Sequence, residues 1–266
     1  MELRDKVVVV IGGGNGIGRQ VVLELLRRGA RVAAVDVRRE SLDETIELAA
    51  AGDRLAVFAV DVTDRAGTKA LPTAVTGVLG AVDVLVNVAG IVQPFVPLED
   101  LECDAIDRVV DVNLKGTINM VKAFLPHLLE RPVAHIANVS SMGGFLPVPG
   151  QTIYGASKTA VKLLTEGLYA ELLDTDVGVS VIMPGAVATE ITAHSGVATP
   201  SVGAEDGGYP MTSPQDAASI IVDGIEKERL HVHVGRDSQV MNLLSRAAPK
   251  QATHVIQRRM RRLVPS

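Results

Sequence analysis

A tyrosine and a lysine stand four residues apart in the stretch Tyr154-Gly-Ala-Ser-Lys158. On a helix, side chains at this spacing share one face. A nearby ammonium group favours the phenolate and lowers the pKa of a phenol, which could then exchange a proton near neutral pH. The spacing therefore suits general acid–base chemistry. Such pairs are also common on solvated helices. Whether this pair is catalytic must therefore be judged from the other segments of the chain.

A glycine-rich segment lies between a predicted strand and a predicted helix near the N-terminus. The apolar run Lys6–Ile11 leads into Gly12-Gly-Gly-Asn-Gly-Ile-Gly18, and Arg19–Arg28 has apolar residues at helical spacing. Glycines permit a tight turn and let the backbone approach a pyrophosphate, whose charge faces the helix N-terminus. The flanking strand and helix favour a dinucleotide site over a glycine connector without a ligand.

An acidic residue follows the second predicted strand, Arg31–Val35. Asp36 lies 18 residues after Gly18, close to the spacing of about 20 expected for a ribose-binding acid. Its carboxylate can accept hydrogen bonds from the ribose hydroxyls and would repel a 2′-phosphate, which favours NAD. Arg38 and Arg39 could instead bind a phosphate, so NADP is the less favoured alternative.

Strands and helices alternate along most of the chain. Helices are predicted over Ser41–Ala50 and Thr68–Leu79, and one long helix or two joined ones over 101–129. Further strands are predicted over Leu55–Val60, Val82–Val86, Val133–Val139, Val177–Met183 and Leu230–Val234. This alternation is typical of a parallel sheet with helices on both faces, whose ligands bind at the C-terminal strand ends. The residues predicted at such ends include Asp36, Asp61, Asn87 and Gly90.

Composition narrows the class of protein. The length of 266 residues suits one α/β domain, and the core must be aliphatic because aromatic residues make up only 3%. The formal charge of −5 argues against a nucleic-acid binder. The single cysteine, Cys103, fits a reducing compartment, and the N-terminal apolar run is too short for a signal peptide or a membrane span. We therefore predict a cytoplasmic protein.

Taken together, these segments resemble the classical short-chain dehydrogenase/reductase family over about residues 4–235. The matching pieces are Gly12-x-x-x-Gly16-x-Gly18, Asp61, Asn87-x-Ala89-Gly90, Asn113, Ser141, Tyr154-x-x-x-Lys158, and Pro184-Gly185 with Thr189. The resemblance implies a single Rossmann-like, doubly wound α/β domain with a mostly parallel seven-stranded sheet in the order 3-2-1-4-5-6-7. It also implies an NAD(P)-dependent oxidoreductase of alcohols and carbonyls.

The resemblance implies a role for each matched residue. Tyr154 would be the general acid/base, and Lys158 would lower its pKa and bind the nicotinamide ribose. Ser141 would hydrogen-bond the substrate oxygen, and Asn113 would hold a water that links Lys158 to solvent. The implied cofactor contacts are Gly12, Asn15, Gly16, Ile17, Gly18, Asp36, Asp61, Val62, Asn87, Ala89, Gly90, Tyr154, Lys158, Pro184, Gly185, Val187 and Thr189. No metal site is expected, because the sequence offers too few grouped ligands.

Two positions depart from the family pattern. The family usually has a threonine where Ile11 stands and a second asparagine where Val88 stands. If both positions lie on neighbouring strands, removing two polar partners together costs less than leaving one unpaired. We therefore predict that the two departures are linked.

Three loops are expected to frame the substrate: Ile91–Leu98, Met142–Gln151 and a lid over about residues 186–212. The first two carry the apolar residues Val92, Phe95, Val96, Met142, Phe145, Leu146 and Val148. No loop contains Lys or Arg, so an anionic substrate would lack a clamp. We predict an apolar secondary alcohol or ketone; the alternative is that these residues only pack against the body. His194 is expected to be an ordinary loop residue.

The C-terminal segment differs from the rest of the chain in charge. Residues 236–266 contain seven Lys/Arg and one acid, a net charge of +6, and the segment breaks at Pro249. We predict a basic helical extension beyond a catalytic domain formed by residues 1–235. Packing on the body or on a second subunit is favoured over contact with an anionic membrane. The resemblance implies a homodimer or homotetramer.

Two other functions stay open. One is NADPH-dependent reduction of a 3-oxoacyl thioester, against which Asp36 argues. The other is an NAD-binding sensor or scaffold without turnover, which would have no need of Ser141, Tyr154 and Lys158 together.

Overall fold

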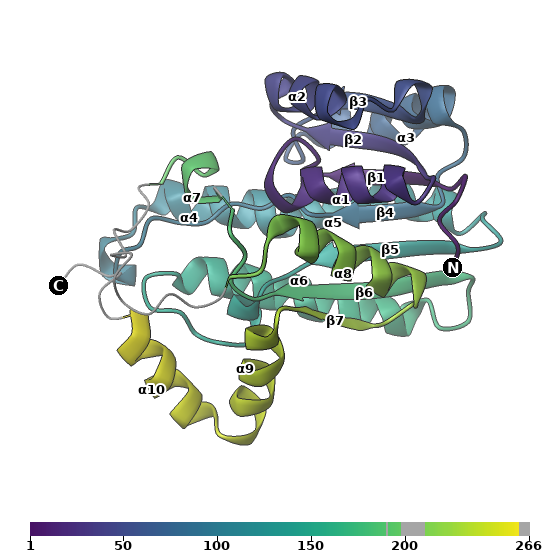
Figure 1. Ribbon diagram of the computed structural model, residues 1–266. Coiled ribbons are helices and arrows are strands. Elements are labelled where there is room, and N and C mark those ends of the chain that lie inside the picture. Colours follow the sequence, from purple (N-terminus) through teal and green to yellow (C-terminus); the bar gives the residue numbers. More distant parts are fainter. Residues whose placement is uncertain (190, 198–210, 261–266) are drawn as a thin grey trace.

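A parallel sheet forms the middle layer of the computed structural model, which describes residues 1–189, 191–197 and 211–260, without the side chain of Arg259 (Figure 1). The strands of the described residues are β1 (Val7–Ile11), β2 (Arg31–Asp36), β3 (Leu55–Ala59), β4 (Val84–Asn87), β5 (Ala134–Val139), β6 (Val177–Pro184) and β7 (His231–Val234). Their order is β3-β2-β1-β4-β5-β6-β7, and every neighbouring pair is parallel. The predicted seven-stranded order is confirmed.

Helices cover both faces of this sheet (Figure 1). They are α1 (Gly16–Arg27), α2 (Arg39–Ala49), α3 (Arg65–Leu79), α4 (Cys103–Val110), α5 (Thr117–Leu128), α6 (Thr152–Glu171), α7 (Ile191–His194), α8 (Pro214–Glu226), α9 (Arg236–Ala247) and α10 (Pro249–Met260). Short 3-10 turns occur at Gly52–Arg54, Leu98–Asp100 and Met142–Gly144. Side chains of α1, α2 and α8 share one core, and those of α3, α5 and α6 share the other. The fold is therefore doubly wound.

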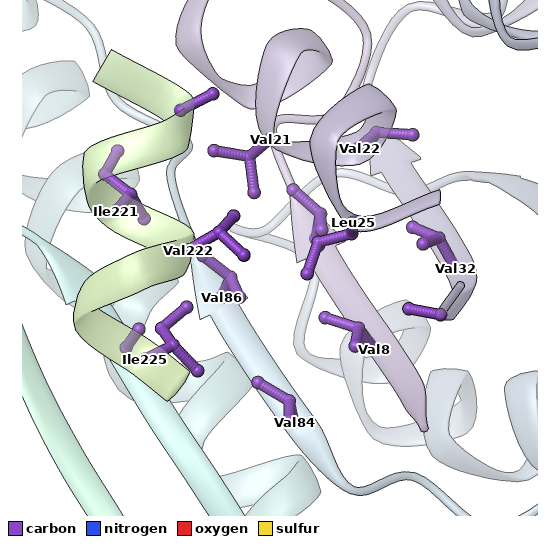
Figure 2. Packing of buried hydrophobic residues seen from close by; sticks show 14 of the residues in the cluster. Val8, Val21, Val22, Leu25, Val32, Val84, Val86, Ile221, Val222 and Ile225 are labelled. Carbon is purple, nitrogen blue, oxygen red and sulfur yellow. The ribbon is translucent and has the colours of Figure 1, made fainter. Parts of the chain in front are cut away.

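The strands are apolar at nearly every position because both faces of the sheet are buried. Successive side chains of β1 alternate between the cores, so Val8 packs with α1 and α8, whereas Val9 packs with Phe124 of α5. Figure 2 shows the first core, in which Leu25 of α1 and Val222 of α8 meet over the sheet. Aliphatic side chains thus fill the core, as the low aromatic content predicts.

The stretch predicted as one or two helices is a continuous helical run with an irregular centre. Between α4 and α5, residues Asp111–Gly116 form a π-helical segment, and this segment contains Asn113. Such π-bulges widen one turn and are frequent at functional sites. Here the bulge sets Asn113, which is fully buried, against the loop after β4.

The departures at Ile11 and Val88 prove to be separate. Ile11 belongs to the core shared by α3, α5 and α6, whereas Val88 packs against the core on the opposite face. The predicted link between them is therefore wrong. Ile11 lies directly beside Asn87 across the β1–β4 pair. It offers no hydrogen-bond donor, and Oδ1 of Asn87 has no partner among the described residues.

The C-terminal helices extend from the body beyond β7 (Figure 1). The predicted break at Pro249 is confirmed, because α10 begins there. The first turn of α9 is tied to the body: Asp237 Oδ2 accepts from the Ala186 backbone N–H at 2.7 Å, and Ser238 Oγ donates to the Met183 carbonyl at 2.7 Å. None of the helices in the described ranges is both long and apolar enough to cross a membrane.

A buried histidine on β5 should make stability depend on pH. The Oγ of Ser180 donates to the Arg229 carbonyl, so Nε2 of His135 donates to Ser180, at 2.8 Å. Nδ1 has no partner among the described residues. Burial lowers the pKa of His135 to about 4. The unfolded chain, with a histidine pKa of about 6.5, therefore binds this proton first, and the stability contributed by the neutral ring is lost as pH falls from about 6.5 to about 4.

We expect this histidine alone to remove on the order of 2 kcal/mol of unfolding free energy between about pH 7.5 and about pH 5. Urea unfolding at both pH values would measure the loss in the native protein and in His135→Gln, which does not titrate. The variant should lose correspondingly less stability on acidification. Equal losses in the two proteins would exclude His135 as the source.

Candidate active site

The glycine segment after β1 forms a turn in which backbone packs on backbone. Gly12 has φ of +84°, a conformation that side chains disfavour, and its N–H donates to the Val35 carbonyl at 2.7 Å. A Cβ on Gly18 would lie 1.9 Å from the Gly12 carbonyl oxygen. The turn can therefore approach a ligand closely, with the N-terminus of α1 beside it.

Side chains of α1 and α2 hold this turn from behind. Nε of Arg19 donates to the Gly14 carbonyl at 2.8 Å and to Thr45 Oγ1 at 3.1 Å, and Nη2 of Arg19 pairs with Glu44 at 2.6 Å. The Thr45 hydroxyl lies 3.2 Å from the Gly13 carbonyl and 3.0 Å from the Ser41 carbonyl, and its one hydrogen can be donated to either. Sequence reasoning missed these contacts, because an arginine near a helix start normally indicates solvent exposure.

Asp36 ends β2 beside the turn, as predicted. Oδ2 accepts from the Gly14 N–H at 3.1 Å, and Oδ1 accepts from the Arg38 N–H at 3.1 Å. These bonds fix the carboxylate at the edge of the cavity described below. Arg38 lines the same cavity, whereas Arg39 pairs with Asp43 at 2.8 Å. Only one of the two arginines considered for phosphate binding therefore lines the site.

A cavity of about 600 Å³ runs along the C-terminal strand ends, a volume that suits a small-molecule site. The predicted residues that line it are Gly12, Asn15, Gly16, Ile17, Gly18, Asp36, Asp61, Val62, Ala89, Gly90, Ser141, Tyr154, Lys158, Pro184, Gly185, Val187 and Thr189. Asn87 and Asn113 do not line it. Asn87 instead donates to Asn138 Oδ1 at 2.7 Å beneath the site.

Tyr154 and Lys158 share one face of α6 and line the cavity together. Nζ of Lys158 lies 6.0 Å from the centre of the Tyr154 ring and donates to the Val139 carbonyl at 3.0 Å. The Oγ of Ser141 accepts from the Gly143 N–H at 3.0 Å, and Ser141 lies near enough to the Tyr154 phenol to influence its pKa. A phenol, a hydroxyl and an ammonium group are thus brought together.

Burial dominates the proton affinity of both groups on α6. It raises the pKa of the Tyr154 phenol, and the side chain of Ser141 offsets part of that rise. It lowers the pKa of Lys158 to about 8. The expected net lowering of the Tyr154 pKa is therefore wrong for the protein alone: desolvation prevails, and the opposing influence comes from Ser141. The effect of Lys158 on Tyr154 during the reaction stays a prediction. Near neutral pH the phenol is protonated.

Asn113 acts as a brace between the loop after β4 and α6. Its Oδ1 accepts from the Ile91 N–H at 2.8 Å, and its Nδ2 donates to the Ile91 carbonyl and to Ser157 Oγ, each at 3.0 Å. Both amide hydrogens are thus used within the protein. Gly90 lies close to this group as well, because a Cβ there would lie 2.9 Å from Nζ of Lys158 and would displace it. The water implied for Asn113 stays a prediction.

The loops expected to frame the substrate contribute unevenly. Among the described residues, the cavity is lined by Ile91 from the first loop and by Ala186, Val187, Thr189, Ile191 and His194 from the third. None of the seven apolar residues predicted to contact substrate lines it. Leu146 is buried in the body, and the Phe145 ring lies edge-on to His233. His194, expected to be an ordinary loop residue, lines the cavity; residues 190 and 198–210 lie outside the described part.

Comparison with known proteins agrees with this geometry. The pattern of the family described as short chain dehydrogenase matches residues 6–198. The chain is 36% identical over 249 residues to a Mycobacterium tuberculosis protein that carries the name oxidoreductase SadH, covering 91% of this chain and 90% of that protein.

Two solved structures are similar over nearly the whole chain. A short chain dehydrogenase/reductase from Burkholderia phymatum in complex with NAD has a TM-score of 0.83 at 26% identity, covering 94% of this chain and 96% of that one. A short chain dehydrogenase from Burkholderia cenocepacia in complex with NADP has a TM-score of 0.80 at 26% identity, covering 100% of both. The chain therefore belongs to the short-chain dehydrogenase/reductase family of oxidoreductases, which use nicotinamide cofactors.

Proposed function

We propose that the protein is an NAD-dependent oxidoreductase that interconverts a secondary alcohol and a ketone, with Tyr154 as general acid/base. One observation carries the proposal: a single cavity is lined both by the glycine turn with Asp36 and by Ser141, Tyr154 and Lys158. The glycine turn and Asp36 fit the pyrophosphate and ribose of a dinucleotide. The three side chains fit a reacting oxygen.

A bound nicotinamide supplies or accepts the hydride. The protein must bind the substrate oxygen and move one proton. The phenol of Tyr154 and the hydroxyl of Ser141, which line the same cavity, can both donate to a carbonyl oxygen. The raised pKa of Tyr154 keeps the phenol protonated near neutral pH, so it is ready to donate. Lys158, with a pKa of about 8, stays largely cationic there and favours the phenolate that forms.

The charges around the cavity support an uncharged, apolar substrate. Arg38, Arg108 and Lys158 are the Lys/Arg residues among the described lining. Arg38 follows the ribose-binding acid, and Arg108 also lines a second hollow with Asp61 and Thr63. Lys158 is assigned to the reacting groups. Beside these, Ile91 and Ile191 offer apolar surface and no clamp for an anion.

An assay of the native protein tests the function. NADH formation from NAD, and NADPH formation from NADP, would be followed with sterols, cyclic and aliphatic secondary alcohols, sugars and 3-hydroxyacyl thioesters. Turnover of uncharged apolar alcohols supports the proposal. Turnover limited to thioesters with the NADP couple would favour the thioester reductase, and tight NADH binding with no turnover would favour the sensor or scaffold.

Replacing Asp36 should weaken the preference for NADH over NADPH. Hydrogen bonds to a charged group are worth about 1.5–3 kcal/mol, so losing the ribose bonds in Asp36→Ala should weaken NADH binding roughly 10–100-fold. The ratio of the NADPH to the NADH dissociation constant, measured by fluorescence titration, should fall at least about tenfold.

Asp36→Asn is the matched control for this test, because it removes the charge and keeps one oxygen that can accept from the Gly14 N–H, while giving up the acceptor for the Arg38 N–H. It should relax the preference while leaving the glycine turn in place. An unchanged ratio in both variants would remove Asp36 from cofactor selection. A native preference for NADPH would revive the thioester reductase, with Arg38 as the phosphate partner.

We further propose a cytoplasmic homodimer or homotetramer that assembles through the helices that hold Asn113 and Tyr154. Leu163 and Leu173, at and beyond the outer face of α6, are well exposed in the single chain and support this. Ala252 of α10 is buried, and α10 packs on α9, whose first turn is bonded to the body; this supports packing of the C-terminal extension within one chain. Sedimentation velocity tests the assembly, and vesicle co-sedimentation with and without residues 250–266 tests membrane contact.

A further inference from the structure

The catalytic helix α6 begins without a cap of its own. The first N–H groups of a helix lack partners within it and are usually satisfied by the side chain of the N-cap residue. Here the N-cap residue is Gln151, whose side chain makes no such bond. Instead, Oε1 of Gln93 accepts from the Ile153 N–H at 2.8 Å and from the Tyr154 N–H at 3.0 Å. The cap therefore comes from the loop after β4.

Neighbouring elements fix the position of Gln93. Nε2 of Gln151 donates to the Gln93 carbonyl at 2.8 Å, so the two glutamines bind each other's segments. The N–H of Val92 donates to Ser195 Oγ at 3.0 Å, just after α7. The residue before it, Ile91, is bound by Asn113 through both its N–H and its carbonyl. Three successive residues are thus held by three different parts of the site.

The contact falls on the backbone of Tyr154 itself. Its N–H is bound by Gln93, and its carbonyl accepts from Ser157 Oγ at 2.7 Å. Ser157 in turn is bound by Asn113. The peptide groups on both sides of the tyrosine are therefore fixed, which restricts where its phenol meets Ser141. Gln93 is only 1% exposed, so water does not replace its bonds.

We infer that Gln93 is a positioning residue for Tyr154, acting as a long-range cap of α6. The inference rests on the proposed role of Tyr154 as general acid/base. A misplacement of about 1 Å at a reacting group can lower the rate about 100-fold, and Gln93 holds the one residue whose phenol must reach the substrate oxygen. Sequence reasoning could not find it, because a lone glutamine in a loop carries no pattern.

The side-chain oxygen of Gln93 is the atom that caps α6. Nε2 of Gln93 has no partner among the described residues, so its loss removes no hydrogen bond seen there. Gln93→Glu keeps an oxygen for the two N–H groups and places negative charge at a helix N-terminus, which is favourable. Gln93→Leu removes the acceptor at similar size. These two variants separate the cap from simple packing.

The first experiment combines turnover with amide hydrogen exchange of a peptide that spans residues 152–158. In Gln93→Leu, kcat should fall about 100-fold while the NADH dissociation constant stays within about twofold. Exchange of the Ile153 and Tyr154 amides should rise about tenfold, as expected for loss of one net hydrogen bond. Gln93→Glu should restore kcat to within about fivefold. Should Gln93→Leu fail to fold, Gln93→Asn, whose side chain is too short to reach, replaces it.

Gln151→Leu is the matched control, since it removes a buried glutamine from the same cluster and leaves the acceptor on Gln93 in place. Its kcat should fall less than about tenfold. A Gln93→Leu enzyme within threefold of native kcat, or unchanged amide exchange, would overturn the inference.

Failure of the proposed function is distinguishable from failure of the cap. If no alcohol is turned over, the phenol of Tyr154 can still be titrated in the NADH complex by tyrosinate absorbance, with Tyr154→Phe as the blank. A change in its apparent pKa in Gln93→Leu that Gln93→Glu reverses supports the positioning role. An unchanged titration contradicts it.

Discussion

Replacing Tyr154 with phenylalanine should lower kcat by about 10²–10⁴-fold and leave NADH binding within about twofold. The substitution removes one oxygen from a ring that lines the cavity. It leaves the glycine turn, which is expected to bind the dinucleotide, unchanged. The missing hydroxyl is the group whose pKa is raised by burial, so that it keeps its proton near neutral pH. Steady-state turnover and a fluorescence titration with NADH would measure the two quantities separately.

Tyr169→Phe provides the control, because Tyr169 lies on the same helix and is 39% exposed rather than facing the cavity. It should leave both kcat and NADH binding unchanged. Near-native turnover by Tyr154→Phe would remove the phenol from the mechanism. A parallel loss of NADH binding would mean that the ring supports the cofactor site instead of the proton transfer.

The strands of the sheet could be predicted because their causes are local, whereas their order was implied only by the family resemblance. Parallel strands buried on both faces read as short apolar runs, and strand ends show as a change to polar residues or glycine. Helix starts were less accurate. Thr68 was the predicted start of α3, but the helix begins at Arg65, where the side chain of Asp64 caps it by accepting from the Ala66 N–H. The spacing of apolar residues cannot reveal a first helical turn whose side chains are mostly exposed.

The part of the site that escaped prediction consists of long-range contacts. The bond from Gln93 to the start of α6 and the bond from Arg19 to the glycine turn join side chains to distant backbone groups, which no spacing rule marks. The pKa of Tyr154 was misjudged for a related reason. Sequence shows that a lysine is near, but the extent of desolvation appears only once the cavity is built.

The substrate loops show the same limit. An apolar side chain in a loop has two possible surroundings, the cavity or the body, and composition does not distinguish them. Leu146 turns into the body, and Phe145 packs on His233. Ile91 and Ile191 line the cavity instead. Specificity should therefore respond to changes at these two isoleucines more than at the aromatic residues of the loops.

Replacing Gly18 with alanine should weaken NADH binding by about 100-fold. The added Cβ would lie 1.9 Å from the Gly12 carbonyl oxygen, which is a backbone atom and cannot rotate away. Gly12 is held by its bond to the Val35 carbonyl, and the backbone of Ala89 lies so close that a Cβ on Gly12 would be 2.8 Å from the Ala89 nitrogen. The turn must then move relative to the N-terminus of α1, where a pyrophosphate would bind. Overpacking typically costs about 1–3 kcal/mol, and about 3 kcal/mol corresponds to roughly 100-fold in affinity.

Gly77→Ala is the matched control for this turn. Gly77 lies inside α3, and a Cβ there would meet nothing within 4 Å among the described residues. Because glycine in a helix is less stable than alanine by about 0.5–1 kcal/mol, this variant should gain stability in urea unfolding and bind NADH normally. Native-like NADH binding by Gly18→Ala would show that the glycine turn does not contact the dinucleotide. If Gly18→Ala lost NADH binding but unfolded in urea like the native protein, its fold would be intact. The close packing of Gly18 would then serve cofactor recognition.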